Sequence, residues 1–190
     1  MFLLSKPSEN EINEFLSARD DDRLSYPEVG GTRNADRPAA YNIDHNQQLL
    51  GNGKDAFALA KRAIREWKMF AIPWVNLCYP DTPIETGRTL AVVIRHFGFY
   101  SLNATRIVYT IDEAARFGFA YGTLTEHGEI GEERFSVEMM PNGEVWYDLY
   151  AFSRPGSLLA KIGYPLSRHL QKQFAQDSKA AMLEAVQTLR

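Results

Sequence analysis

Ionisable side chains gather in the segment 125–134, between two stretches with a strand-like pattern. His127 and Glu129 in this segment could form a general acid–base pair, because a carboxylate orients a neighbouring imidazole and raises its pKa. Glu28, far away in the sequence, is a further candidate for acid–base chemistry. The alternative is a solvated acidic hairpin turn. We favour that turn, because catalysis needs a geometry that spacing alone cannot show.

A metal site in the same segment is a weaker interpretation. Its ligands would be His127, Glu129 and Glu132, but no second histidine lies nearby, and metals that bind imidazole usually take more than one such ligand. The single cysteine, Cys78, excludes an internal disulfide and a cysteine-based zinc site, and we expect it to be inert packing. We therefore expect no metal and no cofactor.

Arginine and aromatic residues within the strand-like stretches are the candidate ligand-binding residues. A strand arginine usually points to solvent; one that points inward must be paired or must bind an acidic group, because an unpaired buried charge is costly. Tyrosine and tryptophan can line a cavity and offer hydrogen-bond donors, although they are more often part of the core. The candidates are Arg95, Arg106, Tyr109, Tyr121, Arg134, Trp146 and Tyr150.

The pattern of the second half predicts the sheet that must position these side chains. Between Thr89 and Ser153 apolar residues recur with a period of two, which is typical of half-buried strands. Pro141-Asn142-Gly143 predicts a hairpin turn. Two further strands are expected earlier, at 41–50 and 74–79. Consecutive strands joined by short turns favour an antiparallel meander.

Three helices are expected around this sheet. Apolar residues at helical spacing predict helices from Ser8 to about Arg19 and from Lys54 to about Phe70, with an ordered loop at 25–40 between them. A long amphipathic helix fills the C-terminal part, with a break at Gly163-Tyr164-Pro165. Its apolar stripe must cover something, and the sheet is the only partner large enough.

Small residues on one face of a predicted strand favour a ligand pocket. Gly118, Ala120 and Gly122 alternate with aromatic residues. Such a face lets another backbone approach, lets the sheet bend, or leaves empty volume. A bent sheet with a helix across its mouth can enclose a concave, mostly apolar site for a small molecule. The alternative is that the small residues only permit tight packing of the helix on the sheet.

The overall composition narrows the class of protein. The chain has 190 residues, of which 45% are hydrophobic and 24% charged, an ordinary globular mixture for one domain. The net charge of -3 offers no basic field for nucleic acid. No stretch approaches the roughly 20 apolar residues of a membrane span, and the start does not read as a signal peptide. We expect a cytoplasmic protein, and its oligomeric state stays open.

Several blocks resemble a known family. They are Tyr26-Pro27-Glu28-Val29-Gly30-Gly31-Thr32, Gly118-Phe119-Ala120-Tyr121-Gly122-Thr123-Leu124, Gly131-Glu132-Glu133-Arg134-Phe135 and Ala151-Phe152-Ser153-Arg154-Pro155, followed by Gln173-Phe174-Ala175-Gln176-Asp177-Ser178. From about Tyr26 to the end, the chain is similar to domain-of-unknown-function family nineteen-ninety. The resemblance implies an α+β helix-grip (START-like, SRPBCC) fold, in which a strongly curved antiparallel sheet wraps around a long C-terminal helix and leaves a cavity. It carries over no catalytic residue.

Three functions remain open at this point. The first is binding of a small apolar or amphipathic molecule in a cavity between the sheet and the C-terminal helix. The second is an enzyme of cyclase, isomerase or hydrolase type that uses polar groups in that cavity. The third is a protein-interaction module with a filled core. In each case we expect one domain, 1–190, with an N-terminal helical extension (1–24) on a helix-grip-like part (25–190).

Overall fold

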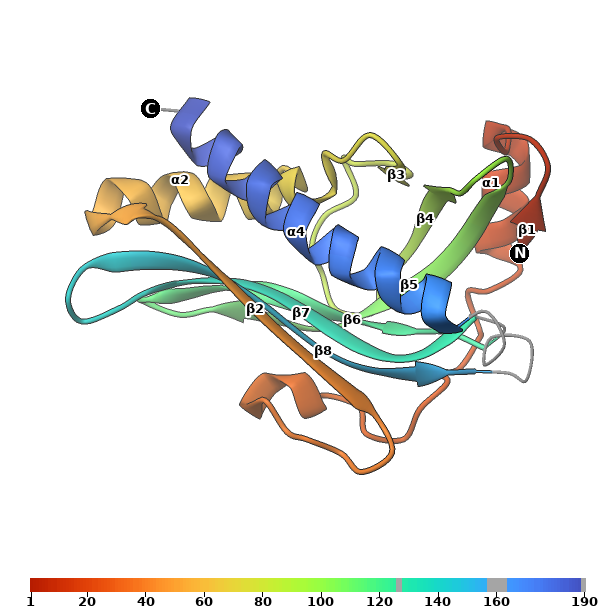
Figure 1. Cartoon of the computed structure of the whole chain (residues 1–190), viewed down its shortest axis with the longest axis horizontal. Helices are drawn as coiled ribbons and strands as arrows, with labels where there is room; N and C mark the ends of the chain where they lie inside the picture. Colours follow the sequence, from red (N-terminus) through yellow and green to blue (C-terminus); the bar gives the residue numbers. More distant parts are fainter. Residues whose placement is uncertain (126–127, 157–163, 189–190) are drawn as a thin grey trace.

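The computed structural model describes residues 1–125, 128–156 and 164–188 of the chain. One antiparallel sheet of eight strands dominates it, in the order β2-β8-β7-β6-β5-β4-β3, with β1 paired to β5 (Figure 1). The strands are β1 (Phe2–Leu3), β2 (Asn42–Asn52), β3 (Val75–Leu77), β4 (Thr89–Arg95), β5 (Tyr100–Asp112), β6 (Arg116–Thr123), β7 (Glu129–Met139) and β8 (Glu144–Pro155). The α-helices are α1 (Glu9–Ser17), α2 (Gly53–Arg65) and α4 (Tyr164–Thr188), and the 3₁₀ helices are η1 (Gly31–Asn34) and η2 (Lys68–Phe70).

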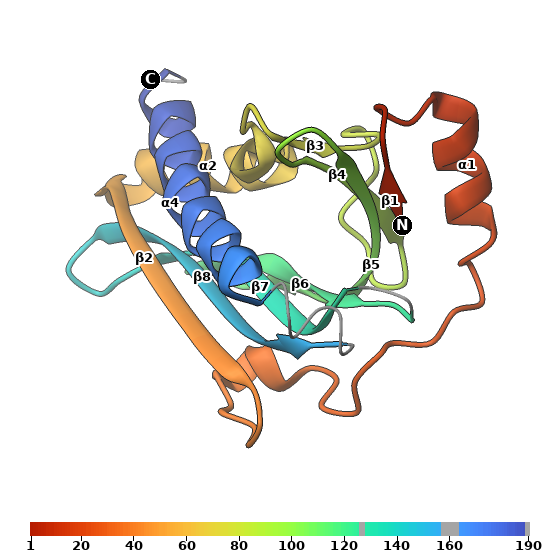
Figure 2. The same ribbon diagram turned by 45° about the vertical axis from the view of Figure 1, so that its right-hand side comes forward.

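The sheet curls, so it has a concave and a convex face. α2 and α4 lie on the concave side, whereas α1 and the loop that carries η1 lie against the convex side (Figures 1 and 2). The predicted antiparallel meander closed by a C-terminal helix is confirmed. None of the helices in the described residues is long and apolar enough to cross a membrane.

The concave face holds the main hydrophobic core. Phe119, Phe135 and Leu149 are fully or almost fully buried there, against Ile64 of α2 and Met182 of α4. Their positions follow from alternation, because every second residue of a strand faces the same side. Burial of each such side chain contributes roughly 1.5–3 kcal/mol, so this core fixes which face of β6, β7 and β8 is inner.

The helices begin and end where local signals place them. Ser8 caps α1 in a capping box, in which the Ser8 hydroxyl accepts from the Glu11 amide and the Glu11 carboxylate accepts from the Ser8 amide. The predicted helix 54–70 is divided, because Trp67 adopts a left-handed backbone (φ 54°) between α2 and η2. Residues 157–163, which include Gly163 of the predicted break, lie outside the described residues.

The small residues of β6 face away from α4, which corrects one of our expectations. Gly118, Ala120 and Gly122 lie on the convex face, so they neither enclose empty volume under the helix nor permit its packing. A Cβ atom on Gly122 would lie 2.0 Å from the hydroxyl oxygen of Tyr26, which belongs to the loop on that face. The missing side chain therefore lets this loop approach the sheet closely.

Candidate functional site

A buried polar network ties the loop 25–40 to the convex face. Glu132 of β7 accepts hydrogen bonds from the Tyr26 hydroxyl (2.7 Å) and from the backbone amides of Gly30 (2.7 Å) and Thr32 (2.9 Å). Tyr26 and Gly30 donate to Oε2, whereas the amide and the hydroxyl of Thr32 both donate to Oε1. Glu132 is 2% exposed, so a carboxylate that would be costly to bury alone is satisfied by four donors.

The ion pair of Arg134 and Asp148 extends this network. The Nη2 atom of Arg134 lies 2.6 Å from Oδ1 of Asp148, and both side chains are buried. His45 (2.6 Å) and Gln47 (2.9 Å) reach the other oxygen of Asp148 from β2. Burial by itself would raise the pKa of Asp148, but the hydrogen bonds from His45 and Arg134 outweigh it and hold the pKa below its ordinary value.

Three of the predicted ligand-binding residues meet in this network. Besides Arg134 they are Tyr109, whose hydroxyl lies 2.7 Å from the Thr32 hydroxyl, and Tyr150, which donates to the Asp36 carbonyl (2.8 Å). All three face the loop on the convex side. Arg134 and Tyr150 donate to carbonyls of the loop, and Tyr109 contacts the hydroxyl of Thr32, so here all three act as anchors of the loop.

Other predicted residues are spread over the molecule. Arg95 is exposed at the end of β4. Arg106 donates to the carbonyls of the turn after α1, at Arg19 (2.8 Å) and Asp22 (2.6 Å). Trp146 is half-buried, and its indole donates to Glu144 within the same strand (3.1 Å). These residues do not converge on one site.

Of the three candidates for acid–base chemistry, Glu28 and Glu129 lie on opposite sides of the sheet. Glu28 lies in the convex-side loop and accepts a hydrogen bond from Tyr41 (2.7 Å). Glu129 begins β7 on the side of α4, where Ser167 donates to it; burial raises the pKa of Glu129 and the hydrogen bond opposes that shift. His127 lies outside the described residues. Within the described residues, no three or more His, Cys, Asp or Glu side chains are placed to hold a metal ion.

Tyr121 and Glu133 form the polar centre of the concave face. The Tyr121 hydroxyl donates to Oε2 of Glu133 across β6 and β7 (2.7 Å). Directly paired residues point to the same face, and the register gives one row across the sheet. The row runs through Ile107, Tyr121, Glu133, Ala151 and Asp44.

Aromatic rings lie beside this pair. The ring of Tyr121 is 5.2 Å from that of Phe135 and 6.3 Å from that of Phe70, measured between centroids. Phe174 of α4 completes the group, with its ring centred 5.7 Å from that of Phe70. Tyr121 and Phe174 are only partly buried and keep accessible surface, whereas Phe70 and Phe135 are buried behind them in the core.

Burial dominates the electrostatics of Glu133. Burial raises the pKa of Glu133 to about 7, opposed by the Tyr121 hydrogen bond and assisted by the negative charge of Asp44. The residue is nevertheless half-buried by its exposed area, unlike its neighbours Glu132 and Arg134. Glu133 therefore combines a partly accessible side chain with a pKa that burial dominates. Tyr121 stays a donor, because burial and Glu133 raise its pKa well above the ordinary value.

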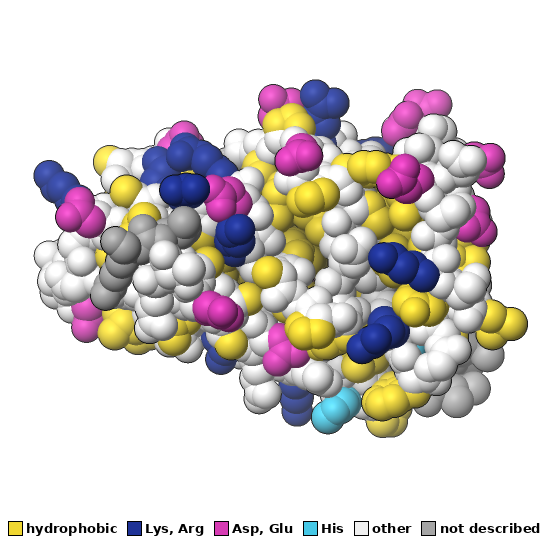
Figure 3. All heavy atoms as spheres, turned by 90° about the horizontal axis from the view of Figure 1, so that it is seen from above, with side chains coloured by type: hydrophobic (Ala, Val, Ile, Leu, Met, Phe, Trp, Pro, Cys, Tyr) yellow, Lys and Arg dark blue, Asp and Glu magenta, His cyan; other side chains and the backbone are white. Residues whose placement is uncertain are grey.

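The N-terminal part of α4 is attached beside this pair by polar contacts to three strands. Arg168 forms a bidentate ion pair with Asp44 of β2, with the Nη2–Oδ1 distance at 2.8 Å. Gln171 donates to the Ser153 hydroxyl of β8 (3.2 Å), and Ser167 donates to Glu129 of β7. Seen from the side of the helices, this face of the molecule is hollowed near its middle, and hydrophobic side chains gather in the hollow (Figure 3).

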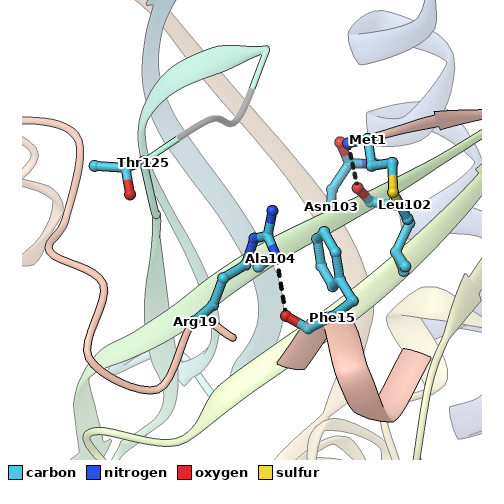
Figure 4. A pocket seen from close by; sticks show the side chains of 7 residues that line it. All are labelled: Met1, Phe15, Arg19, Leu102, Asn103, Ala104 and Thr125. Carbon is cyan, nitrogen blue, oxygen red and sulfur yellow. Dashed lines mark hydrogen bonds between the residues drawn. The ribbon is translucent and has the colours of Figure 1, made fainter. Parts of the chain in front are cut away.

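Two hollows measured over the described residues lie elsewhere. One, between β5, α1 and the N-terminus, has a volume of only about 10 Å³, the space of about one water molecule (Figure 4). The other, about 400 Å³, is an open depression beside residues 28–31 and 36–38 of the convex-side loop. Neither separates the sheet from α4, so the predicted cavity there stays a prediction, supported by Tyr121 and Glu133.

Tyr121 is among the ligand-binding residues predicted from the sequence, whereas Glu133 is not. A signal was present: Glu133 alternates with Phe135 and Val137, which places a carboxylate on an apolar strand face. Glu132 stands next to it, however, and a shift of one residue in register exchanges the faces of the two. Only the packed sheet shows which glutamate is inner.

Comparison with known proteins gives the fold a context. The chain is 33% identical over 207 residues to a "UPF0548 protein" of Dictyostelium discoideum, an alignment that covers 98% of this chain and 96% of the relative. The hypothetical protein jhp0584 of Helicobacter pylori superposes with a TM-score of 0.57 at 12% identity, over 86% of this chain and 95% of that one. The di-domain ARO/CYC StfQ of the steffimycin biosynthetic pathway gives a TM-score of 0.53 at 9% identity, over 78% and 52%.

At such low identities the two solved structures show similarity of fold alone, and that fold is the helix-grip. Sequence similarity is more specific. The family model described as Domain of unknown function (DUF1990) matches residues 25–181, which include both the convex-side loop and the Tyr121–Glu133 pair. This chain therefore belongs to the DUF1990 family.

Proposed function

We propose that the chain binds a small, partly apolar molecule on the concave face of the sheet beside α4, with Tyr121 and Glu133 as its polar anchors. The observation that carries the proposal is the position of this pair. Two hydrogen-bonding groups lie among hydrophobic side chains and keep accessible surface inside the curve of the sheet. Small-molecule sites combine an apolar lining with a few placed polar groups in this way.

The first test is native mass spectrometry of protein purified gently from its own host, followed by denaturation and identification of any released compound. We expect a stoichiometric small molecule with an apolar body. A mass without ligand, together with no thermal stabilisation by a broad panel of apolar compounds, would contradict binding and favour the interaction module.

A blocking variant locates the site. Ala151 lies beside Glu133 in the transverse row and is only partly buried, so Ala151→Phe fills the space next to the pair. We expect this variant to lose the bound compound. Arg95→Ala, at an exposed position outside the concave face, is the matched control and should keep it. Loss in both variants, or in neither, would argue against this location.

Catalysis is the second candidate, and one observation favours it. A carboxyl group with a pKa of about 7 is suited to general acid–base chemistry near neutral pH, and Glu133 has such a pKa. The compound identified above is the substrate to test. Conversion to an isomer or hydrolysis product by the protein, but not by Glu133→Gln, would support an enzyme. Unchanged compound after long incubation would support simple binding.

A further inference from the structure

Unlike Asp148, Asp44 and Glu132, Glu133 has neither a cationic partner nor more than one hydrogen bond among the described residues. Asp148 pairs with Arg134 and Asp44 with Arg168, while Glu132 accepts four hydrogen bonds. Glu133 accepts one hydrogen bond, at Oε2 from Tyr121, and within the described residues no Lys, Arg or His forms an ion pair with it. Its second oxygen, Oε1, has no hydrogen-bond donor there. Within the part of the chain that the structure describes, this acid therefore has no counter-charge.

The side chains near the carboxylate suit a positive group. The faces of aromatic rings carry negative potential and attract cations within about 6 Å of the ring centre. Tyr121 and Phe135 contact each other beside Glu133, with Phe70 and Phe174 next to them. The rings of Tyr121 and Phe174 keep accessible surface, so an ammonium group paired with Glu133 would have an aromatic surface nearby.

We propose that the concave-face site selects molecules that carry a protonated amine on an apolar body, the amine pairing with Glu133 and the body lying against the aromatic rings. This inference rests on the proposed function and deepens it by naming the ligand class. A carboxylate ligand would instead be placed beside the negative charge of Glu133, and a neutral alcohol could not supply the missing counter-charge.

Three probes of one shape test the charge preference: 4-phenylbutylamine, 4-phenylbutanol and 4-phenylbutyrate. Their dissociation constants are measured by titration calorimetry on the full chain at pH 8, where Glu133 is mostly ionised. We expect the amine to bind about tenfold more tightly than the alcohol, the gain typical of a hydrogen bond to a charged group, and the carboxylate to bind weakest. An amine that binds no better than the alcohol would overturn the inference.

Two substitutions on the same strand separate the carboxylate from general effects. Glu133→Gln should remove the preference for the amine and leave alcohol binding nearly unchanged. Glu138→Gln is the matched control, because Glu138 lies on β7 but on the opposite face, and it should keep the preference. A preference that persists in Glu133→Gln would overturn the inference. Binding of none of the three probes would contradict the proposed function itself.

The pH dependence gives an independent readout. The groups that face Glu133 are Tyr121 and Tyr147 from the neighbouring strands, and Asp44 with its partner Arg168 from β2 and α4. Glu129, which accepts from Ser167, lies four residues away along β7. Both tyrosines stay neutral below pH 9, because their pKa values are raised. Amine affinity should therefore rise between pH 6 and 8 and then level off, while alcohol affinity stays flat. A flat amine profile would contradict a role for the Glu133 charge.

Discussion

At the scale of single residues, two adjacent glutamates show how environment divides one residue type into two roles. Glu132 points to the convex face and is surrounded by donors of the loop, so its charge is stabilised. Glu133 points to the concave face and receives one hydrogen bond, so its ionised form is disfavoured. The first holds the fold together, and the second costs stability, which is typical of groups kept for binding or catalysis.

Replacing Glu133 should therefore stabilise the protein at high pH. The folded-state pKa of Glu133 is about 7, above the ordinary value of 4.5, so the unfolded state releases this proton first as pH rises. The free energy of unfolding consequently falls between about pH 4.5 and 7, by up to about 3 kcal/mol for this group. Glu133→Gln removes that loss. We expect its melting temperature to exceed that of the native protein at pH 8, and the difference to shrink at pH 4.5.

Thermal unfolding of both proteins across this pH range checks the prediction. Glu138→Gln provides the control for the general effect of removing one negative charge. If Glu133→Gln gave the same shift at every pH, or a larger one at low pH, the burial of an ionisable Glu133 in the folded state would be wrong.

At the scale of elements, alternation along β6 predicted much of what the structure shows. It correctly placed Phe119 and Tyr121 on one face and Gly118, Ala120 and Gly122 on the other. It could not say which face is inner, because both alternatives satisfy the same period and only long-range packing decides. In this structure the loop 25–40 covers the face of the small residues, where its Tyr26 packs against Gly122. Contacts between positions about 100 residues apart leave no local trace in the sequence.

The close contact between this loop and β6 predicts the effect of one added methyl group. Gly122→Ala would place a Cβ atom 2.0 Å from the Tyr26 hydroxyl and must displace that ring from Glu132. We expect a loss of about 1–3 kcal/mol in the free energy of unfolding, as for other overpacked sites. Hydrogen exchange at the amides of Gly30 and Thr32 should become faster, because they share the same carboxylate.

A double-mutant cycle separates this clash from a general effect on the strand. In a Tyr26→Ala background, Gly122→Ala should cost much less than it does alone. Gly128→Ala, where an added Cβ atom meets nothing within 4 Å, is the neutral control. Equal costs of Gly122→Ala in both backgrounds would show that the loop does not depend on this glycine.

At the scale of the whole molecule, the two faces of the sheet have different tasks. The convex face is closed by the chain's own N-terminal part, through the Glu132 and Arg134 network and through a second apolar cluster under α1. The concave face is covered by α2 and α4. The transverse row of residues that contains Tyr121 and Glu133 ends at Asp44, which pairs with Arg168. Most arginines and tyrosines predicted as ligand contacts proved to lie on the convex side, because in this fold a strand residue beneath a covering loop is as buried as one beneath the helix.

The N-terminal extension should accordingly be part of the folded unit, although the family match begins only at residue 25. Ile12 and Phe15 of α1 are buried against β4 and β5, and Arg106 binds the carbonyls that follow this helix. Deleting residues 1–24 exposes that cluster and removes the carbonyls that Arg106 binds, while its hydrogen bond to the Thr89 hydroxyl remains. Two buried side chains alone contribute about 3–6 kcal/mol, so we expect urea unfolding of the shortened chain to begin at a clearly lower concentration.

Phe15→Ala in the full chain should lower the free energy of unfolding by about 3–5 kcal/mol, whereas Glu14→Ala, at an exposed position of the same helix, should leave it unchanged. Probe binding per folded molecule should be unchanged, since α1 lies on the convex side. An unaltered unfolding midpoint after the deletion would instead make residues 1–24 an appendage, and the helix-grip part a domain that folds without them.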